Sequence, residues 1–362
     1  MIRPGRRRFA ALVAGTVVAA GSTLVAAAPA GAVNFYGDAG YRVTIRAGEV
    51  SAEWRVPAIR SGSRLGSART FVYANYQPSL VLLELGTIES EVSIHGRHVA
   101  RYSAFWNRNG YSANTFHSVN AGDLVKAEAA LKRKGWELTM IDYTGRWQHT
   151  VTNPGVGKTS ITRVGWLQED PSTASLPTPL QDPLASYPEV APVVFTHLSV
   201  NNKAPQLAWS GALYIETLGG EAILPTRPSG DGFSLQAASG ATLQYMVDVA
   251  PYNFAFRRFN YLVDLWTGKT TGSERYSQSQ PFLAAIEAFV RRLSSQHWPG
   301  TVRSDILDLA AVDGQVAGLL QQLPSLSLSQ LASWEDDVIK VLSISHSIGY
   351  EIHADLGMPA TV

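Results

Sequence analysis

Two glutamates stand among apolar residues, where a carboxylate is costly to bury. Glu169 lies in the stretch VGWLQEDP, residues 164–171, and Glu84 interrupts the aliphatic run LVLLELGT. A buried carboxylate is retained where it has a partner or a chemical task, such as activating water as a general base. For Glu169 alone, a surface residue at a strand end remains the alternative. The recurrence at Glu84 favours a paired carboxyl site.

The face of each glutamate follows from strand alternation. In an extended strand Trp166 and Gln168 point to one side, and Leu167 and Glu169 point to the other. If Glu84 follows the same rule, both carboxylates can lie on one face of a sheet. We therefore predict that they lie on adjacent strands of one sheet, with their carboxyl groups within reach of one water.

Other motifs do not support a different chemistry. The segment Gly155 to Thr159, GVGKT, is similar to the end of a phosphate-binding loop, but Thr152 stands where the first glycine belongs and no helical pattern follows. His95 and His98 are not part of a His-Glu-x-x-His sequence, so we interpret them as structural or surface residues. No Gly-x-Ser-x-Gly sequence occurs. We predict neither a metal site nor a cofactor.

The region from Val33 to about Ala250 is predicted to consist of short strands. The alternating segments are residues 41–47, 49–56, 124–131, 136–143 and 233–238. Many such strands without intervening helices indicate a mainly β, jelly-roll-like (concanavalin-like) antiparallel β-sandwich. The Pro- and Ser-rich stretch from Pro171 to Pro192 is predicted to be a long loop.

The apolar spacing changes to three and four residues after Tyr276, which predicts a C-terminal α-helical appendage. Pro281 suits the first turn of one helix, Ser304 can cap a second, and Leu331 opens the apolar stripe of a third. We thus expect a β-sandwich over residues 33–250, a connecting segment over 251–276 and helices over 277–362.

The N-terminus resembles an export signal. Residues 1–32 combine four arginines with a small, apolar stretch and the cleavage-like Ala30-Gly31-Ala32. The run Arg6-Arg7-Arg8-Phe9 also resembles a twin-arginine signal. We expect residues 1–32 to be removed, the mature chain to be secreted, and no membrane anchor to remain.

The charge of the chain argues against nucleic acid as a partner, and its cysteine content restricts the possible chemistry. The chain has 30 basic and 29 acidic residues, so removal of the four signal arginines leaves 26 basic against 29 acidic residues. No basic stripe remains for nucleic acid. The absence of cysteine excludes disulfides and thiolate chemistry, so the hydrophobic core must stabilise the fold.

Seven short motifs, in order, resemble the eqolisin family of glutamic endopeptidases. They are Asn34-Phe35-Tyr36-Gly37, Ala52-Glu53-Trp54-Arg55-Val56-Pro57, Leu83-Glu84-Leu85-Gly86, Tyr102 to Trp106, Ala121-Gly122-Asp123, Trp166-Leu167-Gln168-Glu169 and Gly232-Phe233-Ser234. The helical appendage lies outside the resemblance. The resemblance implies a Gln/Glu pair that hydrolyses peptide bonds at acid pH, with Glu169 in the position of the catalytic glutamate.

The chain departs from the family pattern at three places. Glu84 stands where the family has its glutamine, Asn107 where it usually has glutamate, and Tyr73 in a segment that replaces Trp-Val-Gly. A protonated Glu84 can donate a hydrogen bond to an oxyanion, whereas an ionised one repels it. Two facing carboxyls in apolar surroundings should titrate jointly, with one pKa raised.

We therefore expect an acid-acting endopeptidase with Glu169 as general base and Glu84 as its protonated partner. The aromatic residues Trp54, Tyr73, Phe105 and Trp106 are expected to line the substrate cleft or the core beside it. Two alternatives remain: an inactive β-sandwich that binds a peptide or glycan, and an interaction protein whose helical appendage contacts an unknown partner.

Overall fold

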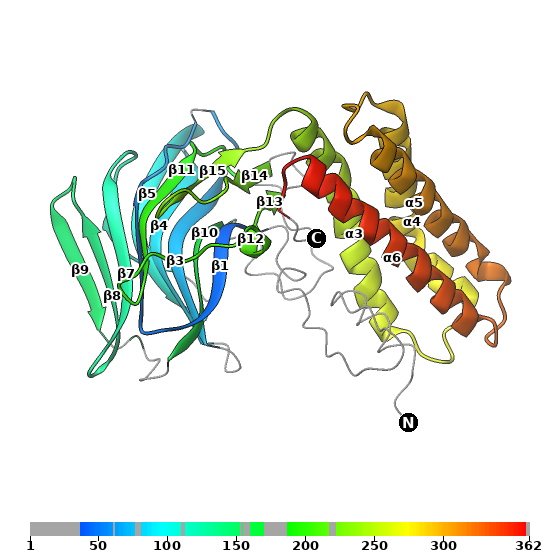
Figure 1. Cartoon of the computed structure of the whole chain (residues 1–362), viewed down its shortest axis with the longest axis horizontal. Coiled ribbons are helices and arrows are strands. Elements are labelled where there is room, and N and C mark those ends of the chain that lie inside the picture. Colours follow the sequence, from blue (N-terminus) through cyan, green and yellow to red (C-terminus); the bar gives the residue numbers. More distant parts are fainter. Residues whose placement is uncertain are drawn as a thin grey trace. The chain divides into compact units, whose positions relative to one another are not determined.

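The computed structural model describes residues 37–60, 62–76, 81–109, 113–152, 154, 160–169, 187–216 and 222–359, and they form two compact units, a β-unit and a helical unit that begins at Ser239 (Figure 1). The predicted signal peptide, the first three residues of the opening Asn34 motif and most of the predicted loop after Pro171 lie outside the described residues.

The β-unit consists of two antiparallel sheets. The seven-stranded sheet has, in spatial order, β12 (Ala212–Leu213), β1 (Asp38–Ala47), β10 (Ile161–Glu169), β3 (Gly66–Tyr76), β4 (Val81–Ile94), β5 (Arg97–Arg108) and β6 (Asn114–Ser118). The eight-stranded sheet has β13 (Ile215–Glu216), β14 (Ala222–Pro225), β15 (Phe233–Ala237), β11 (Val193–Val200), β2 (Glu49–Arg55), β7 (Leu124–Lys132), β8 (Gly135–Asp142) and β9 (Trp147–Thr152). All five strand segments predicted from alternation are strands.

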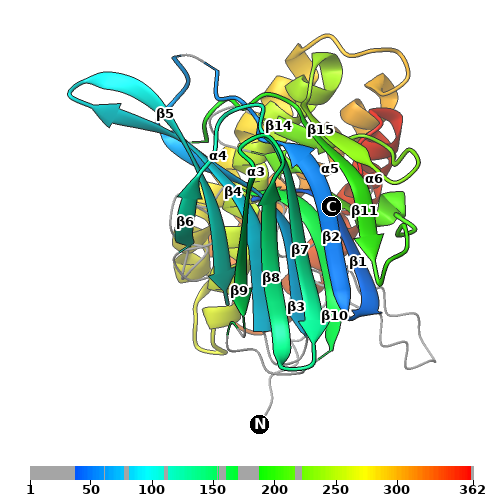
Figure 2. The ribbon, with the colours of Figure 1, turned by 90° about the vertical axis from the view of Figure 1, so that its left-hand side faces the viewer.

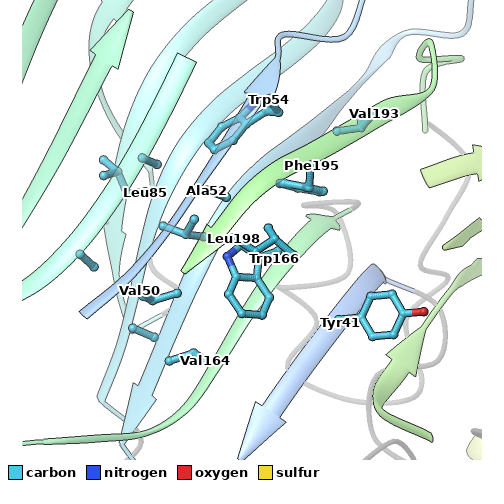
Figure 3. Close-up of a cluster of buried hydrophobic side chains, with 14 of the residues drawn as sticks. Tyr41, Val50, Ala52, Trp54, Leu85, Val164, Trp166, Val193, Phe195 and Leu198 are labelled. Atoms are coloured by element: carbon cyan, nitrogen blue, oxygen red, sulfur yellow. The ribbon is translucent and has the colours of Figure 1, made fainter. Parts of the chain in front are cut away.

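The sheets pack face to face, as Figure 2 shows for β2, β7 and β8 in front of β3 and β10. The core between them contains the large side chains Trp54, Trp166 and Phe195, each at most 1% exposed (Figure 3). Trp54 and Phe195 come from neighbouring strands of one sheet, with ring centroids 5.6 Å apart. Burial of such rings supplies most of the driving force for this sandwich.

A second, smaller apolar cluster lies on the opposite face of the seven-stranded sheet. It contains Phe71, Tyr73, Phe105, Leu167 and Leu213. Strand β10 is consequently buried on both faces at its C-terminal end, whereas the edge strand β9 is largely exposed. We call the side of the seven-stranded sheet that carries this cluster its outward face, since it points away from the core between the sheets.

The described residues of the helical unit form four long helices: α3 (Gly240–Leu265), α4 (Gly272–Ser295), α5 (Arg303–Gln322) and α6 (Leu331–Asp355). Aromatic rings hold α3 to α4, with the Phe259 and Phe282 centroids 4.8 Å apart and those of Tyr252 and Phe289 5.0 Å apart. None of the described helices is long and apolar enough to cross a membrane.

The antiparallel sandwich and its C-terminal helical region are confirmed, but three expectations about the helices are wrong. Ser304 does not cap α5, because it lies inside that helix and Val302 is at the N-cap. The segment 251–276 is not a connector, because α3 spans residues 240–265 and the last strand ends at Ala237. Its apolar spacing starts at Tyr245, and Pro251 inside the helix obscures the pattern. Pro281 does not open a helix either; α4 begins earlier, where Thr271 and Glu274 form a capping box.

Candidate functional site

Glu84 and Glu169 both project from the outward face of the seven-stranded sheet. On β10, Trp166 packs in the core between the sheets, while Leu167 packs in the cluster on the outward face. On β4, Leu83 and Leu85 point into the core, so Glu84 between them points outward. The predicted face of Glu169, which it shares with Leu167, and the common sheet face of the two glutamates are therefore confirmed.

The two glutamates are not on adjacent strands, however, because β3 lies between β10 and β4. Glu169 is opposite Arg69 of β3, and Glu84 is opposite Tyr73, four residues further along the same strand. Phe71 lies between these two positions. The prediction of adjacent strands is thus wrong, because it required β4 to pair with β10, and both of these strands pair with β3 instead.

An apolar row separates the two carboxyl positions. Leu167, Phe71, Gly86 and Phe105 follow one another across β10, β3, β4 and β5. The Phe71 and Phe105 rings meet edge to face, with centroids 6.2 Å apart. The outward face therefore offers an aromatic surface with an acidic group on each side.

Gly86 has no room for a side chain. A Cβ atom at this position would lie 2.0 Å from the backbone oxygen of Thr70 on the neighbouring strand. The glycine follows Glu84 by two residues and lies between the two phenylalanines of the apolar row. The close approach of β3 and β4 beside Glu84 consequently depends on glycine here.

A third carboxyl and two arginines complete the charged groups. Asp38 of β1 is opposite Glu169 and pairs with Arg42, which is two pleats along the same strand. Arg69 Nη1 donates to Glu169 Oε2 at 3.3 Å. Glu84 has a neutral partner instead: Asn107 Nδ2 donates to its Oε2 at 2.9 Å.

Burial raises the pKa of all three carboxyls. It raises the pKa of Glu84 to about 7, against the lowering effects of the Asn107 hydrogen bond and the Arg69 charge. Burial raises the pKa of Glu169 well above its ordinary value, and the Glu84 charge raises it further. At Asp38 burial again outweighs the lowering effect of Arg42 on the pKa. Three acids facing two guanidiniums reach neutrality when they retain one proton.

The four aromatic residues predicted to line the site divide between two faces. Tyr73 and Phe105 lie on the outward face, with Arg42 over the Tyr73 ring at 5.1 Å and Arg69 over the Phe105 ring at 5.6 Å. Trp54 instead packs in the core and donates through Nε1 to Thr87 Oγ1 at 3.3 Å. Trp106 also packs against that core, because it neighbours Phe105 and must point the opposite way.

Sequence reasoning missed Asp38, Arg42 and Arg69. The four-residue spacing of Asp38 and Arg42 puts both on one strand face, which was a usable signal. Their position beside Glu169 depends on the pairing of β1 and β3 with β10, and this pairing joins distant parts of the chain. Among the described residues, no group of three or more His, Asp or Glu side chains could hold a metal ion.

No protein-family model and no curated protein matches the chain. Among solved structures it is similar to scytalido-glutamic peptidase with a transition state analog inhibitor, at 14% identity and a TM-score of 0.44 over 56% of this chain and 98% of that chain. It is also similar to SCP-B, a member of the eqolisin family, in a complex with the tripeptide Ala-Ile-His, at 14% identity and a TM-score of 0.38 over the same shares. A third is aspergilloglutamic peptidase from Aspergillus niger, at 18% identity and a TM-score of 0.37 over 48% and 99%. Similarity of this degree does not assign an activity.

Proposed function

We propose that the β-unit is a glutamic-type endopeptidase that acts below neutral pH through Glu84 and Glu169. The observation that carries the proposal is their common position on one sheet face, on either side of an aromatic row, with the pKa of both raised. Raised, coupled carboxyl pKa values are typical of acid–base sites. The sequence resemblance to glutamic endopeptidases supplies the peptide as substrate class.

In the proposed mechanism Glu169 is the general base that takes a proton from water and later returns it to the leaving amine. Glu84 keeps the one proton that the three neighbouring carboxyl groups retain. Burial and the Glu84 charge raise the pKa of Glu169, and they compete with the direct contact of Arg69. We place the proton on Glu84 because Glu169 contacts a guanidinium directly, whereas the hydrogen bond that Glu84 receives from the described residues comes from a neutral amide.

The raised pKa values set the expected pH dependence. When both carboxyls are protonated, no base remains, so hydrolysis falls at the acidic end. When both are ionised, like charges repel a developing oxyanion, so hydrolysis also falls as the pH rises through about 7. We expect a bell-shaped profile with its maximum on the acidic side of neutrality.

The proposal is tested by digestion of unfolded casein from acidic to neutral pH, with wild type and with Glu169→Gln. Glu169→Gln keeps the shape but cannot accept a proton, and it should abolish hydrolysis while circular dichroism shows an unchanged fold. If Glu169→Gln stays active and Glu84→Gln is inert, the two glutamates have exchanged roles. Wild type that cleaves nothing at any acidic pH contradicts the peptidase function.

A binding module without catalysis is the second candidate, and the arginine contacts favour it. Arg42 and Arg69 neutralise Asp38 and Glu169, so the charged groups can be read as structural ion pairs beside an aromatic surface. If the β-unit only binds, Glu169→Gln and wild type should bind an unfolded peptide with equal affinity, and neither should cleave it. An immobilised-peptide assay with product analysis distinguishes the two candidates.

We also propose that the chain is exported and that residues 1–32 are removed. Four arginines before a small, apolar stretch support this proposal. N-terminal sequencing of protein from the culture medium should begin at Val33. Protein that stays in the cell and begins at Met1 contradicts it.

A further inference from the structure

We infer that Asn107 is the hydrogen-bond donor to the carbonyl oxygen of the scissile peptide bond, and that a proton on Glu84 frees its amide for this contact. The inference deepens the proposed function and rests on it. It assigns to the neutral side chain beside Glu84 the task of meeting the negative charge that develops on the substrate.

The position of Asn107 supports the assignment. It lies directly opposite Glu84 across the β4–β5 pair and is 1% exposed. Its Nδ2 donates to Glu84 Oε2 at 2.9 Å. Its Oδ1 is buried and has no hydrogen-bond partner among the described residues. A buried, unpartnered amide oxygen costs free energy, which suggests that it meets a group absent from the free protein.

The hydrogen-bonding capacity of the pair depends on the proton. An ionised Glu84 accepts from Nδ2, and this orientation turns the Oδ1 acceptor away from Glu84. A protonated Glu84 has an O–H to donate, and Asn107 Oδ1 is an acceptor beside it. The side-chain amide can rotate by half a turn with little change in shape. The rotation exchanges the acceptor for two N–H donors at the same place.

Such an exchange matters because an oxyanion requires donors. Electrostatic stabilisation of the developing oxyanion is usually the largest single contribution to catalysis of this kind. An oxygen facing the substrate carbonyl would oppose the reaction, and an N–H would favour it. The proton on Glu84 therefore changes the site from an acceptor to a donor without placing a net charge on Asn107.

The other polar and charged side chains that face Glu84 already form contacts with other residues. From β1, Arg42 pairs with Asp38, and from β3, Arg69 pairs with Glu169 of β10. Tyr73, opposite Glu84 on β3, accepts from Asn75 Nδ2 at 2.9 Å and still has a hydroxyl proton to donate. Tyr73 is consequently the rival donor, and Tyr73→Phe is the matched comparison.

Kinetics of the full chain separate these donors. Asn107→Leu should lower kcat by roughly 100- to 1,000-fold with a smaller change in KM, as for other lost oxyanion donors. Tyr73→Phe should have a much smaller effect. Glu84→Gln can donate permanently to Asn107 Oδ1, so it should keep hydrolysis and extend it toward neutral pH. If Asn107→Leu is as active as wild type while Glu169→Gln is inert, the inference fails and the proposed function stands.

An NMR titration tests the amide without requiring activity. In asparagine-labelled full-length protein, the side-chain N–H₂ resonances that vanish in Asn107→Leu identify Asn107. They should shift with pH in wild type and remain constant in Glu84→Gln. Resonances that do not move in wild type, or that move equally in Glu84→Gln, overturn the inference. This outcome is independent of whether any form cleaves peptide.

Discussion

Arg69 lies directly opposite Glu169 across the β10–β3 pair and donates to its carboxylate at 3.3 Å. Both side chains are largely buried, at 13% and 11% exposure. The guanidinium also lies over the Phe105 ring, with 5.6 Å between its carbon and the ring centroid. An arginine held on two sides in this way fixes the carboxylate more firmly than an exposed ion pair would.

Replacing Arg69 by methionine should therefore destabilise the β-unit at neutral pH, because Glu169 would be left buried without its cation. Breaking one side of a buried pair typically costs about 3–5 kcal/mol. Acid should reduce the cost, since a protonated Glu169 no longer needs a cation. Urea unfolding near pH 7 and near pH 4 measures both values.

Arg60→Met is the matched control. Arg60 pairs with Glu189 at 3.0 Å, but these side chains are 80% and 50% exposed, so we expect a change below about 1 kcal/mol. Equal losses for Arg69→Met at the two pH values would show that the arginine acts through packing on Phe105 rather than through its charge.

The sequence predicts the face of each glutamate but not the neighbours of each strand. Alternation correctly places Leu167 with Glu169 and opposes them to Trp166, because side-chain period is a local property of the backbone. The position of β3 between β10 and β4 depends on pairing between distant segments, which local pattern does not determine. Asp38 and the arginines were missed for that reason.

The faces of Phe105 and Trp106, unlike the order of the strands, follow from local pattern. Phe105 and Trp106 are consecutive in β5, so they cannot line the same face of a sheet. Phe105 packs on the outward face, and Trp106 packs against the core. Alternation alone therefore places one of the two aromatic side chains on the outward face and the other toward the core.

Glu89 is a fully buried carboxyl on the core side of β4, two residues from Thr87. Thr87 donates to its Oε1 at 2.6 Å and Thr70 to its Oε2 at 3.3 Å. Trp54 of the other sheet donates to Thr87, and Gln168 donates to Thr70 at 3.4 Å. A chain of donors thus ends on a fully buried group, and burial raises the pKa of Glu89 well above its ordinary value.

Glu89→Gln should make the β-unit more stable than wild type at neutral pH. In the unfolded chain Glu89 ionises at its ordinary pKa, about 4.5, whereas the folded protein retains the proton to higher pH. The contribution of Glu89 to the stability of wild type is therefore fully present below that value, and it declines as the pH rises toward the pKa of Glu89 in the folded protein. Glutamine does not ionise, so the difference between the variants should grow from about pH 4 upward in urea unfolding.

Two further variants check the cause. Glu89→Leu leaves the hydroxyls of Thr70 and Thr87 without an acceptor, at a cost of about 1–3 kcal/mol each, and should be less stable than wild type in acid. Glu137→Gln, at a half-buried position of β8 in the other sheet, should show no such dependence on pH. A pH-independent difference between Glu89→Gln and wild type would contradict this account.

Truncation tests the unit boundary that the structure places before α3. A chain ending at Ala238 keeps all the described strands and should retain a β-type circular dichroism spectrum. A chain ending at Tyr276 keeps α3 but loses Phe282 and Phe289, against which Phe259 and Tyr252 pack. This longer chain should expose an apolar helix face and aggregate, as gel filtration would show. Unfolding of the shorter chain would mean that the helices complete the β core.

Asp313 of α5 should make the stability of the helical unit depend on pH. It is fully buried, and its Oδ1 accepts from Ser345 Oγ of α6 at 2.8 Å and from Tyr252 Oη of α3 at 3.4 Å. Burial raises its pKa to about 7, against the lowering effect of these two hydrogen bonds. Its ordinary value is 3.8, so between these pH values the unfolded chain loses a proton that the folded unit retains.

This difference in bound protons determines the direction in which the stability of the helical unit changes with pH. Stability is fully present in acid and declines as the pH rises from the ordinary value toward about 7. An interval of about 3 pH units corresponds to about 4 kcal/mol. Asp313→Asn keeps the acceptor for Ser345 but cannot ionise, so it should flatten the decline and be the more stable form near neutral pH. Asp308→Asn, at an exposed position of the same helix, should leave the decline unchanged. Far-UV circular dichroism during thermal unfolding at several pH values measures the decline for each variant. Equal slopes for wild type and Asp313→Asn would contradict this account, because they would show that Asp313 binds protons equally in the folded and the unfolded chain.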